Sequence, residues 1–417
     1  MEILYVLLVL LIATRTLGEV AVRMGQPPLI GELMAGVLLG IFVVHNGDTF
    51  PILSDLPENP AFEALTDLGV FFLMMIAGLE LRPSKLAEAS GRSIGVALGG
   101  LLVPLALGVA TGWWLLPDSE LRPAQSLFLG VALAITAVPV AVGVLMSLDQ
   151  LDTVVGRTIV SAAIVDDVLS LLLLAMLTAI LRTGGVPDTS AVLGLIGQVA
   201  LFFAIALPFG RYALPWLGRR VAGLRSDEFE FSLLILVGLG FAVLAEALAM
   251  HFLIGAFLAG LFFVRRTIDP RTYEDVSRKI GALTSGFFAP VFFASIGIHL
   301  DAGALREAPV FVVALFLIAT AGKLLGTGLP ARLSGLSSRD SLAVGLGMNA
   351  RGAVELIVAD VAFRAGLFEG PDHPIVASLY SAVVVTAILT TLVTPLGLEW
   401  LYRKRERNTP RGERDGP

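Results

Sequence analysis

Long apolar runs alternate with short polar or Gly/Pro-rich stretches along the whole chain. A transmembrane helix needs about 20 mostly apolar residues, and thirteen runs of this kind are readable, with boundaries good to a few residues. They lie near 2–18, 28–45, 61–81, 92–116, 126–147, 153–181, 190–210, 229–247, 249–264, 281–299, 308–330, 341–364 and 376–401. The pattern predicts an all-α polytopic membrane protein with thirteen transmembrane helices.

Composition excludes several function classes. The 417 residues are 56% hydrophobic and 15% charged, with a mean hydropathy of +0.85, whereas an average soluble domain carries about 25% charged residues. This excludes a soluble enzyme. Cysteine is absent, so no disulfide framework or thiolate metal cluster forms. The net charge of −6, spread over loops, excludes a basic footprint for nucleic acid.

The distribution of Lys and Arg predicts the orientation, because cytoplasmic loops retain these residues. Of the 29 basic residues, 23 fall in one set of loops and the C-terminal tail. The opposite set holds only Arg122, Arg182, Arg306 and Arg364, while Lys323 and Arg351 lie inside spans. We therefore expect the N-terminus outside and the C-terminus in the cytoplasm.

Thirteen spans divide into two halves of six joined by one connecting span. Spans 1–6 and 8–13 are then expected to be inverted-topology repeats, with 190–210 as the linker. The fifth span of each half is interrupted, near 135–145 and 347–356. Matched interruptions of this kind indicate a binding site near the bilayer midplane, because broken helices present helix ends and bare carbonyls to an ion.

Specific residues cause these interruptions. In ITAVPVAVGVL, Pro139 removes a helical hydrogen bond and Thr136 offers an oxygen to the freed backbone. In GMNARGAVEL, Gly347, Asn349 and Gly352 cluster round the charged Arg351, and Asn349 is expected to support the broken helix. A proline kink with a glycine-rich packing face is the alternative reading of either segment. The correspondence between the two halves favours the binding site.

The sixth span carries two adjacent carboxylates, Asp166 and Asp167, within SAAIVDDVLSLLLLA. A carboxylate near the bilayer centre costs at least about 2.5–3.5 kcal/mol on insertion scales, which favours a function for the pair. Adjacent residues point roughly 100° apart around a helix, so the two acids are expected to face different surroundings. Since neighbouring carboxylates resist ionising together, they suit exchange of a proton for a cation.

Lys323, in the eleventh span, is the expected counter-charge. The chain has 4 Lys against 25 Arg, and a buried Lys can lose its proton whereas Arg stays charged. A structural salt bridge is the alternative role. Arg351 and Glu355 are four residues apart on one helix, which predicts an internal ion pair that braces the broken segment.

Seven motifs spread over nearly the whole chain resemble the second family of monovalent cation:proton antiporters, bacterial Na⁺/H⁺ and K⁺/H⁺ exchangers with an NhaA-type fold. They are GQPPLIGELMAGVLLG (25–40), LMMIAGLEL (73–81), ITAVPVAVGVL (135–145), VDD (165–167), GAFLAGLFF (255–263), PVFFASIGIHLD (290–301) and GLGMNARGAVELIVA (345–359). Each motif alone is weak, and together they are specific.

The resemblance implies roles for three of these residues. Asp167 matches the carboxylate that binds cation and proton in turn. Asp166 matches a position that is Asp or Asn in electrogenic members and often Gln in glutathione-gated potassium efflux systems, and Lys323 matches the lysine that pairs with it. The resemblance also implies a homodimer and an elevator-like movement of spans 4–6 and 11–13. Many relatives append a nucleotide-binding domain, so gating by nucleotide or glutathione is not expected within these 417 residues.

These inferences predict a transmembrane exchanger domain and a tail. The expected parts are an exchanger domain over 1–400, with an ion-carrying core in 92–181 and 308–400, a dimerisation part in 1–91 and 229–299, a linker helix in 190–210, and a short basic cytoplasmic tail in 401–417.

The sequence therefore predicts a transporter in the bacterial inner membrane that exchanges Na⁺, or Li⁺ or K⁺, for protons. Its partners are these ions, membrane lipid and a second copy of the chain. Neither a cofactor nor a metal beyond the transported cation is expected. A cation-coupled symporter of a small organic anion and a K⁺/H⁺ efflux antiporter remain alternatives, since fold alone does not fix function. An intramembrane aspartyl protease would place its two Asp on different helices.

Overall fold

A computed structural model of the chain describes residues 2–46, 56, 59–80, 90–148, 150–151, 153–183, 189–221, 229–248, 250–263, 270–369 and 373–408. Within these ranges the chain is helical and forms no β-strand. Nine helices there are long and apolar enough to cross a membrane, and two shorter apolar helices accompany them. The protein is therefore an all-helical, multi-pass membrane protein, as the hydropathy pattern predicts.

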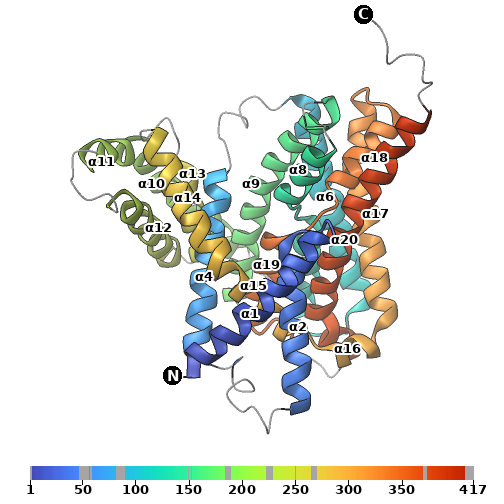
Figure 1. Ribbon diagram of the computed structural model, residues 1–417, viewed down its shortest axis with the longest axis horizontal. Helices are drawn as coiled ribbons and strands as arrows, with labels where there is room; N and C mark the ends of the chain where they lie inside the picture. Colours follow the sequence, from blue (N-terminus) through green and yellow to red (C-terminus); the bar gives the residue numbers. More distant parts are fainter. Residues whose placement is uncertain are drawn as a thin grey trace, which may run out of the picture. The chain divides into compact units, whose positions relative to one another are not determined.

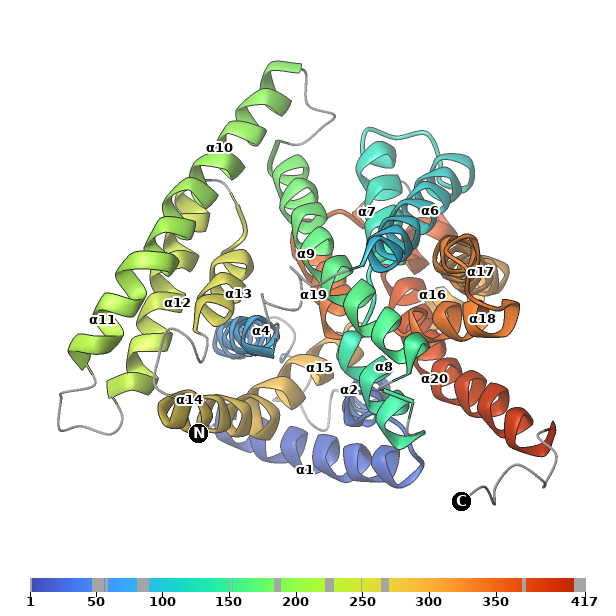
Figure 2. The ribbon, with the colours of Figure 1, turned by 90° about the horizontal axis from the view of Figure 1, so that it is seen from above.

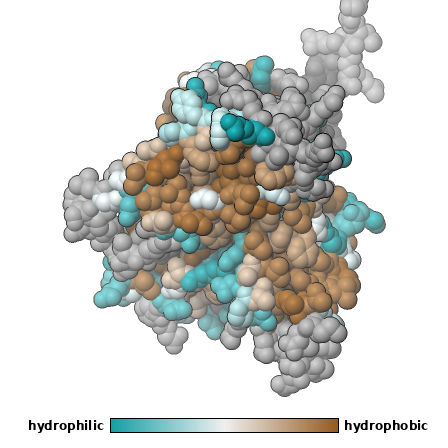
Figure 3. Space-filling view, turned by 90° about the vertical axis from the view of Figure 1, so that its left-hand side faces the viewer, coloured by the Kyte–Doolittle hydropathy of each residue, from teal (hydrophilic) through white to brown (hydrophobic). Residues whose placement is uncertain are grey.

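Large apolar side chains stay exposed on the helix surfaces. Val243 is 69% exposed and Val310 is 80% exposed, and hydrophobic residues cover much of the face shown in Figure 3. Soluble monomers rarely expose contiguous apolar areas of this kind. These side chains are suited to contact with lipid.

The chain divides into two compact units. The first comprises Met1–Ser84, Leu173–Ala302 and Asp360–Leu367. Its helices are α1 (Glu2–Arg23), α2 (Pro28–Asn46), α4 (Pro60–Glu80), α10 (Thr189–Pro208), the π-helix η1 (Phe209–Ala213), α11 (Leu214–Val221), α12 (Phe229–Ala247), α13 (Phe252–Phe262), α14 (Pro270–Leu283), the π-helix η2 (Thr284–Phe288) and α15 (Ala289–Ile298). Helices α10, η1 and α11 run in one line along α12 (Figure 2).

Close helix pairs hold the first unit together. α2 packs against α15, and α4 packs against α13. A Cβ added to Gly36 of α2 would meet the backbone of α15 at Ala294, and one on Gly78 of α4 would meet α13 at Phe257. Small residues let helices approach closely where lipid provides no hydrophobic driving force between them.

The second unit comprises Lys85–Leu172, Gly303–Ala359 and Phe368–Pro417. Its helices are α6 (Gly91–Leu115), α7 (Arg122–Ala134), α8 (Val138–Ser147), most of α9 (Val154–Thr183), most of α16 (Ala302–Glu307), α17 (Pro309–Leu333), α18 (Ser338–Gly347), the start of α19 (Ala353–Arg364) and α20 (Pro374–Asn408). α6 packs against α7 (Figure 2) and against α17, and α17 packs against α18 and α20 (Figure 1). Gly99 and Gly326 bring the backbones of α6 and α17 into contact.

One helical stretch corrects the sequence prediction. We expected the tenth span to begin at 281, with a basic loop before it, but α14 starts at Pro270. Its charged residues pair within the helix, since Asp275 lies 2.5 Å from Arg278 and 2.8 Å from Lys279. Val276 and Ile280 are buried on the opposite side. An amphipathic helix of low mean hydropathy is missed by a search for continuous apolar runs.

Candidate functional site

Two helices of the second unit are interrupted where the sequence predicts. α7 ends at Ala134 and α8 begins at Val138, while α18 ends at Gly347 and α19 begins at Ala353. Ile135 and Met348, the C-cap residues of α7 and α18, therefore each lead into a short non-helical break. Each predicted span is thus built as two half-helices.

The two breaks contact each other directly. The Ala137 backbone N–H donates to the Ala350 carbonyl over 2.8 Å, and the Thr136 hydroxyl donates to the Met348 carbonyl over 3.3 Å. Gly352 allows the approach, because a Cβ there would lie 2.8 Å from the Ala137 Cβ. The freed backbone groups of one break are thus partly satisfied by the other, as a non-helical segment inside a membrane protein requires.

Pro139 occupies a different place from the one expected. The sequence suggested that it breaks a continuing helix, whereas the structure puts it in the first turn of α8, directly after Val138. Proline is favoured there because the first-turn N–H groups have no partner within the helix. Pro139 therefore starts the second half-helix, and the break precedes it.

A buried ion pair lies beside the crossing. The Lys323 ammonium on α17 lies 3.5 Å from Asp166 Oδ2 on α9, and both side chains are fully buried. The ammonium also donates to the Thr136 hydroxyl over 2.6 Å and to the carbonyl of Ala134. The latter contact places a positive charge on the C-terminal end of α7, where the helix dipole favours it.

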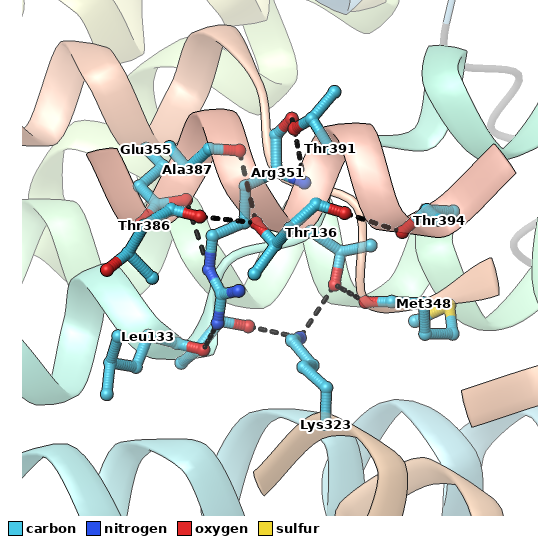
Figure 4. Close-up of polar contacts among 12 residues, drawn as sticks. Leu133, Thr136, Lys323, Met348, Arg351, Glu355, Thr386, Ala387, Thr391 and Thr394 are labelled. Carbon is cyan, nitrogen blue, oxygen red and sulfur yellow. Dashed lines mark hydrogen bonds and ion pairs between the residues drawn. The ribbon is translucent and has the colours of Figure 1, made fainter. Parts of the chain in front are cut away.

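A second buried ion pair, formed by Arg351 and Glu355, lies near Lys323 (Figure 4). Arg351 Nε lies 3.1 Å from Glu355 Oε2, as the four-residue spacing predicts, and both side chains are fully buried. Arg351 Nη2 also donates to the Leu133 carbonyl over 2.8 Å. Arg351 therefore links the start of α19 to the end of α7, so that two cationic side chains meet the last carbonyls of α7.

Asp167 lies next to this cluster on α9 in different surroundings from its neighbour. It is half-buried, while Asp166 is fully buried. The roughly 100° between consecutive helix positions accounts for the difference. One acid of the pair is therefore held in the Lys323 ion pair, and the other is the more accessible carboxylate.

Threonines on α20 form part of the site that sequence reasoning missed. Thr386, Thr390, Thr391 and Thr394 are all buried, and the Thr391 hydroxyl accepts from the Arg351 backbone N–H over 3.3 Å and donates to the Arg351 carbonyl. The four-residue spacing of Thr386, Thr390 and Thr394 along a predicted span was a readable signal of a polar helix face. α20 thus fixes the backbone of the second break.

The buried side chains of the cluster carry balanced charge, with two acids and two bases. Removing one member of a buried ion pair is strongly destabilising because it leaves its partner uncompensated. Exchanging one cation for another near an acid conserves the balance. The arrangement is therefore suited to a metal cation that takes the place of a proton on an acid, or the place of the ammonium beside an acid. Among the described residues, no group of three or more His, Asp and Glu forms a resident metal site.

Comparison with known proteins gives a consistent match over the whole chain. The profile of the family described as "Sodium/hydrogen exchanger, transmembrane" matches residues 6–404. The Na⁺/H⁺-K⁺ antiporter GerN of Bacillus cereus is 30% identical over 407 residues, which cover 97% of this chain and 98% of GerN. An Na⁺/H⁺ antiporter of Enterococcus hirae is 31% identical over 405 residues, which cover 97% of this chain and 99% of that protein.

A solved structure shows the same fold. The sodium proton antiporter MjNhaP1 of Methanocaldococcus jannaschii, determined at pH 8, superposes with a TM-score of 0.75 at 17% sequence identity. The match covers 97% of this chain and 99% of that chain. The helix arrangement is therefore shared well beyond the level of sequence similarity.

Proposed function

Because the chain belongs to the sodium/hydrogen exchanger family, we propose that it exchanges Na⁺ for protons across the bacterial inner membrane by alternating access. It is a transporter and not an enzyme. The observation that carries the proposal is the buried Lys323–Asp166 pair beside two crossed helix breaks. The name of GerN includes K⁺, which supports K⁺ as a candidate cation beside Na⁺ and Li⁺.

In this proposal Asp167 binds the cation and the proton in turn. It is a carboxylate inside a membrane helix and is more accessible than Asp166. Thr136 adds a hydroxyl oxygen, since hard cations prefer oxygen ligands. Pro139, Arg351 and Glu355 support the two half-helices.

The transport is electrogenic in the same proposal. In the cation-free state Asp166 keeps Lys323 charged. A cation at Asp167 competes for the acid pair, and Lys323 then releases its proton. Each cycle moves two protons, one from Asp167 and one from Lys323, against one Na⁺. The contact of 3.5 Å between Lys323 and Asp166 supports this coupling because it is long enough to be weakened by a nearby cation.

The architecture in this proposal is an NhaA-type arrangement of thirteen spans in two inverted repeats. Equivalent helices make equivalent pairs, since α2 packs on α15 as α13 packs on α4, and α6 packs on α7 as α17 packs on α18. Glycine contacts repeat the pattern, with Gly36 facing Gly297 in one pair and Gly260 and Gly78 placed similarly in the other. This repetition supports a pseudo-two-fold relation between the halves.

The two compact units have different roles in the proposal. The unit with both broken helices moves as the ion carrier, and the other forms the contact of a homodimer. The N-terminus is outside and the C-terminus is in the cytoplasm. The division of the chain into two units supports a movement of one against the other.

Purified protein in proteoliposomes tests the function. A pH-sensitive dye inside the vesicles reports proton movement after addition of Na⁺, Li⁺, K⁺ or choline outside. Exchange driven by Na⁺ and absent with choline is expected. Uptake of a small organic anion that depends on Na⁺, with no cation-driven proton movement, would instead establish a symporter. Exchange driven by K⁺ alone would establish a K⁺/H⁺ antiporter.

A further inference from the structure

Asn349, in the break between α18 and α19, is a fully buried amide. Among the described residues, neither its Oδ1 nor its Nδ2 has a hydrogen-bond partner. Burying a polar group without a partner costs folding free energy, and native proteins hold few such groups. The packing of the cation-free chain therefore does not explain why a buried amide occupies this position.

The place of Asn349 in the fold matches that of Thr136. Each is the first residue after the C-cap of the first half-helix, because Thr136 follows Ile135 and Asn349 follows Met348. The two side chains are therefore presented at equivalent points of the two breaks. Thr136 already lies in the charged cluster, with its hydroxyl 2.6 Å from the Lys323 ammonium.

Backbone contacts bring Asn349 close to that cluster. The carbonyl before it, of Met348, accepts from Thr136 at 3.3 Å, and the carbonyl after it, of Ala350, accepts from Ala137 at 2.8 Å. Standard peptide geometry then puts the Asn349 Cα within roughly 6 Å of the Thr136 hydroxyl. The backbone on both sides of Asn349 is therefore held by hydrogen bonds at the crossing of the two breaks.

We propose that the Asn349 side-chain oxygen is a direct ligand of the transported alkali cation, together with Thr136 and Asp167. The inference rests on the proposed antiport and adds a ligand to its site. Amide carbonyl oxygens suit hard cations. Two oxygens on α9, Asp166 Oδ1 and Ser170 Oγ, lie one turn apart and are also buried without a hydrogen-bond partner in the described part of the chain. This helix therefore also has oxygen atoms that can accept a further contact.

A bracing role, as the sequence alone suggested for Asn349, makes the opposite demand on the structure. A brace acts through hydrogen bonds from its amide to neighbouring segments. The described residues provide no such bonds. The two roles therefore predict opposite effects of removing the amide on stability without cations.

The test compares wild type with Asn349→Leu, which has similar size and no polar side-chain atoms, and Asn349→Thr, which keeps an oxygen. Thr158→Val is the matched control, since Thr158 is buried in the same unit and, within the described part of the chain, its hydroxyl bonds only the Val154 carbonyl of its own helix, at 2.7 Å. Two quantities are measured for each protein. They are the Tm in detergent in choline and in Na⁺ buffers, and the apparent KM for Na⁺ in proteoliposomes.

We expect Asn349→Leu to unfold in choline at or above the wild-type Tm, because replacing an unpaired buried polar group by an apolar one is neutral or stabilising. Its Na⁺-induced rise in Tm shrinks, since a ligand stabilises only in proportion to its binding. Its KM for Na⁺ rises about tenfold, the loss of one ligand to a charged group. Asn349→Thr recovers part of both effects, and Thr158→Val keeps wild-type values.

Two results would overturn the assignment. A lower Tm of Asn349→Leu in choline would show that the amide stabilises the resting chain. A wild-type KM and Na⁺-induced shift in Asn349→Leu would show that it does not touch the cation. Failure of the antiport itself is recognised separately, because wild type would then show neither Na⁺-driven exchange nor a Na⁺-induced shift.

Discussion

At the scale of single residues, the two neighbouring acids on α9 differ in their exposure. Asp166 is fully buried against Lys323, while Asp167 is half-buried. An ammonium without a partner inside a membrane is costly, so Asp166 is committed to the pair. In the proposed mechanism the neighbouring, more accessible carboxylate is the group that meets ions from the aqueous side.

Asp167→Asn is expected to abolish cation/proton exchange. The substitution keeps the shape of the side chain and removes its exchangeable charge, so neither a proton nor a cation is bound there. Na⁺-driven proton flux in proteoliposomes should fall to the level of empty vesicles. Asp118→Asn is the matched control, because the Asp118 side chain is 89% exposed, and it should exchange like wild type. Retained exchange by purified Asp167→Asn would refute the role of this carboxylate.

Thr136→Val is expected to raise the apparent KM for Na⁺ about fivefold, which corresponds to about 1 kcal/mol for one lost oxygen ligand. Valine preserves the size of the side chain and removes the hydroxyl that contacts Lys323 at 2.6 Å. The maximal rate should change less than the KM. An unchanged KM would restrict Thr136 to its hydrogen bond with the Met348 carbonyl.

The charged side chains of the site can be identified from the sequence, but their backbone partners cannot. Asp166, Asp167 and Lys323 are conspicuous because charges are rare within apolar spans. The carbonyls of Leu133 and Ala134, which accept from Arg351 and Lys323, carry no sequence signature. They become acceptors only because α7 stops before its last carbonyls are paired within the helix.

At the scale of helices, the crossing of the two breaks depends on a missing side chain. Gly352 lies where a Cβ would come within 2.8 Å of the Ala137 Cβ. That atom is attached to the backbone of the other break, so it moves only if the break moves.

Gly352→Ala is therefore expected to destabilise the protein by about 1–3 kcal/mol, the usual effect of overpacking, and to slow transport. The measurements are the Tm and the Na⁺-driven proton flux. Gly91→Ala, at the start of α6, serves as the control because a Cβ there meets none of the described residues within 4 Å. An unchanged Tm and flux in Gly352→Ala would show that the breaks need no such close approach.

Helix interruptions were predictable where residues that disfavour a helix fall inside an apolar run. The interruptions near 135–145 and 347–356 were visible in the sequence, since Pro, Gly and Asn disfavour continuous helices. That they cross and share hydrogen bonds depends on pairs more than 200 residues apart, such as Thr136 with Met348, which one sequence does not reveal. The start of α14 was missed because its charges pair along the helix.

At the scale of the whole molecule, the count of thirteen spans stays a prediction from the apolar runs, and the inside position of the C-terminus stays a prediction from the charge distribution. The absence of cysteine from the sequence makes the orientation directly measurable. Single cysteines placed in the native chain are labelled without a background.

Asp118→Cys and Ser338→Cys test the orientation, because Asp118, between α6 and α7, and Ser338, at the start of α18, are both exposed in the same unit. Asp118 lies between spans 4 and 5 and is expected outside, while Ser338 lies between spans 11 and 12 and is expected inside. A membrane-impermeant maleimide should label Asp118→Cys in intact cells and Ser338→Cys only after permeabilisation. The reverse pattern would invert the topology.

The net charge moved in each transport cycle tests the central claim most directly. A net movement of charge requires both the Asp167 site and the Lys323–Asp166 pair to take part. The measurement is the dependence of Na⁺/H⁺ exchange on an imposed membrane potential in proteoliposomes, for wild type, Lys323→Gln and Lys323→Arg. Wild-type exchange should be driven by the potential. Lys323→Gln lacks the second titrating group, so its exchange should be lost or become independent of the potential, and its Tm should be lower. Lys323→Arg keeps a permanent charge and should likewise lose potential-driven exchange. Wild-type exchange that ignores the potential, or Lys323→Arg exchange as potential-driven as wild type, would contradict proton release by Lys323.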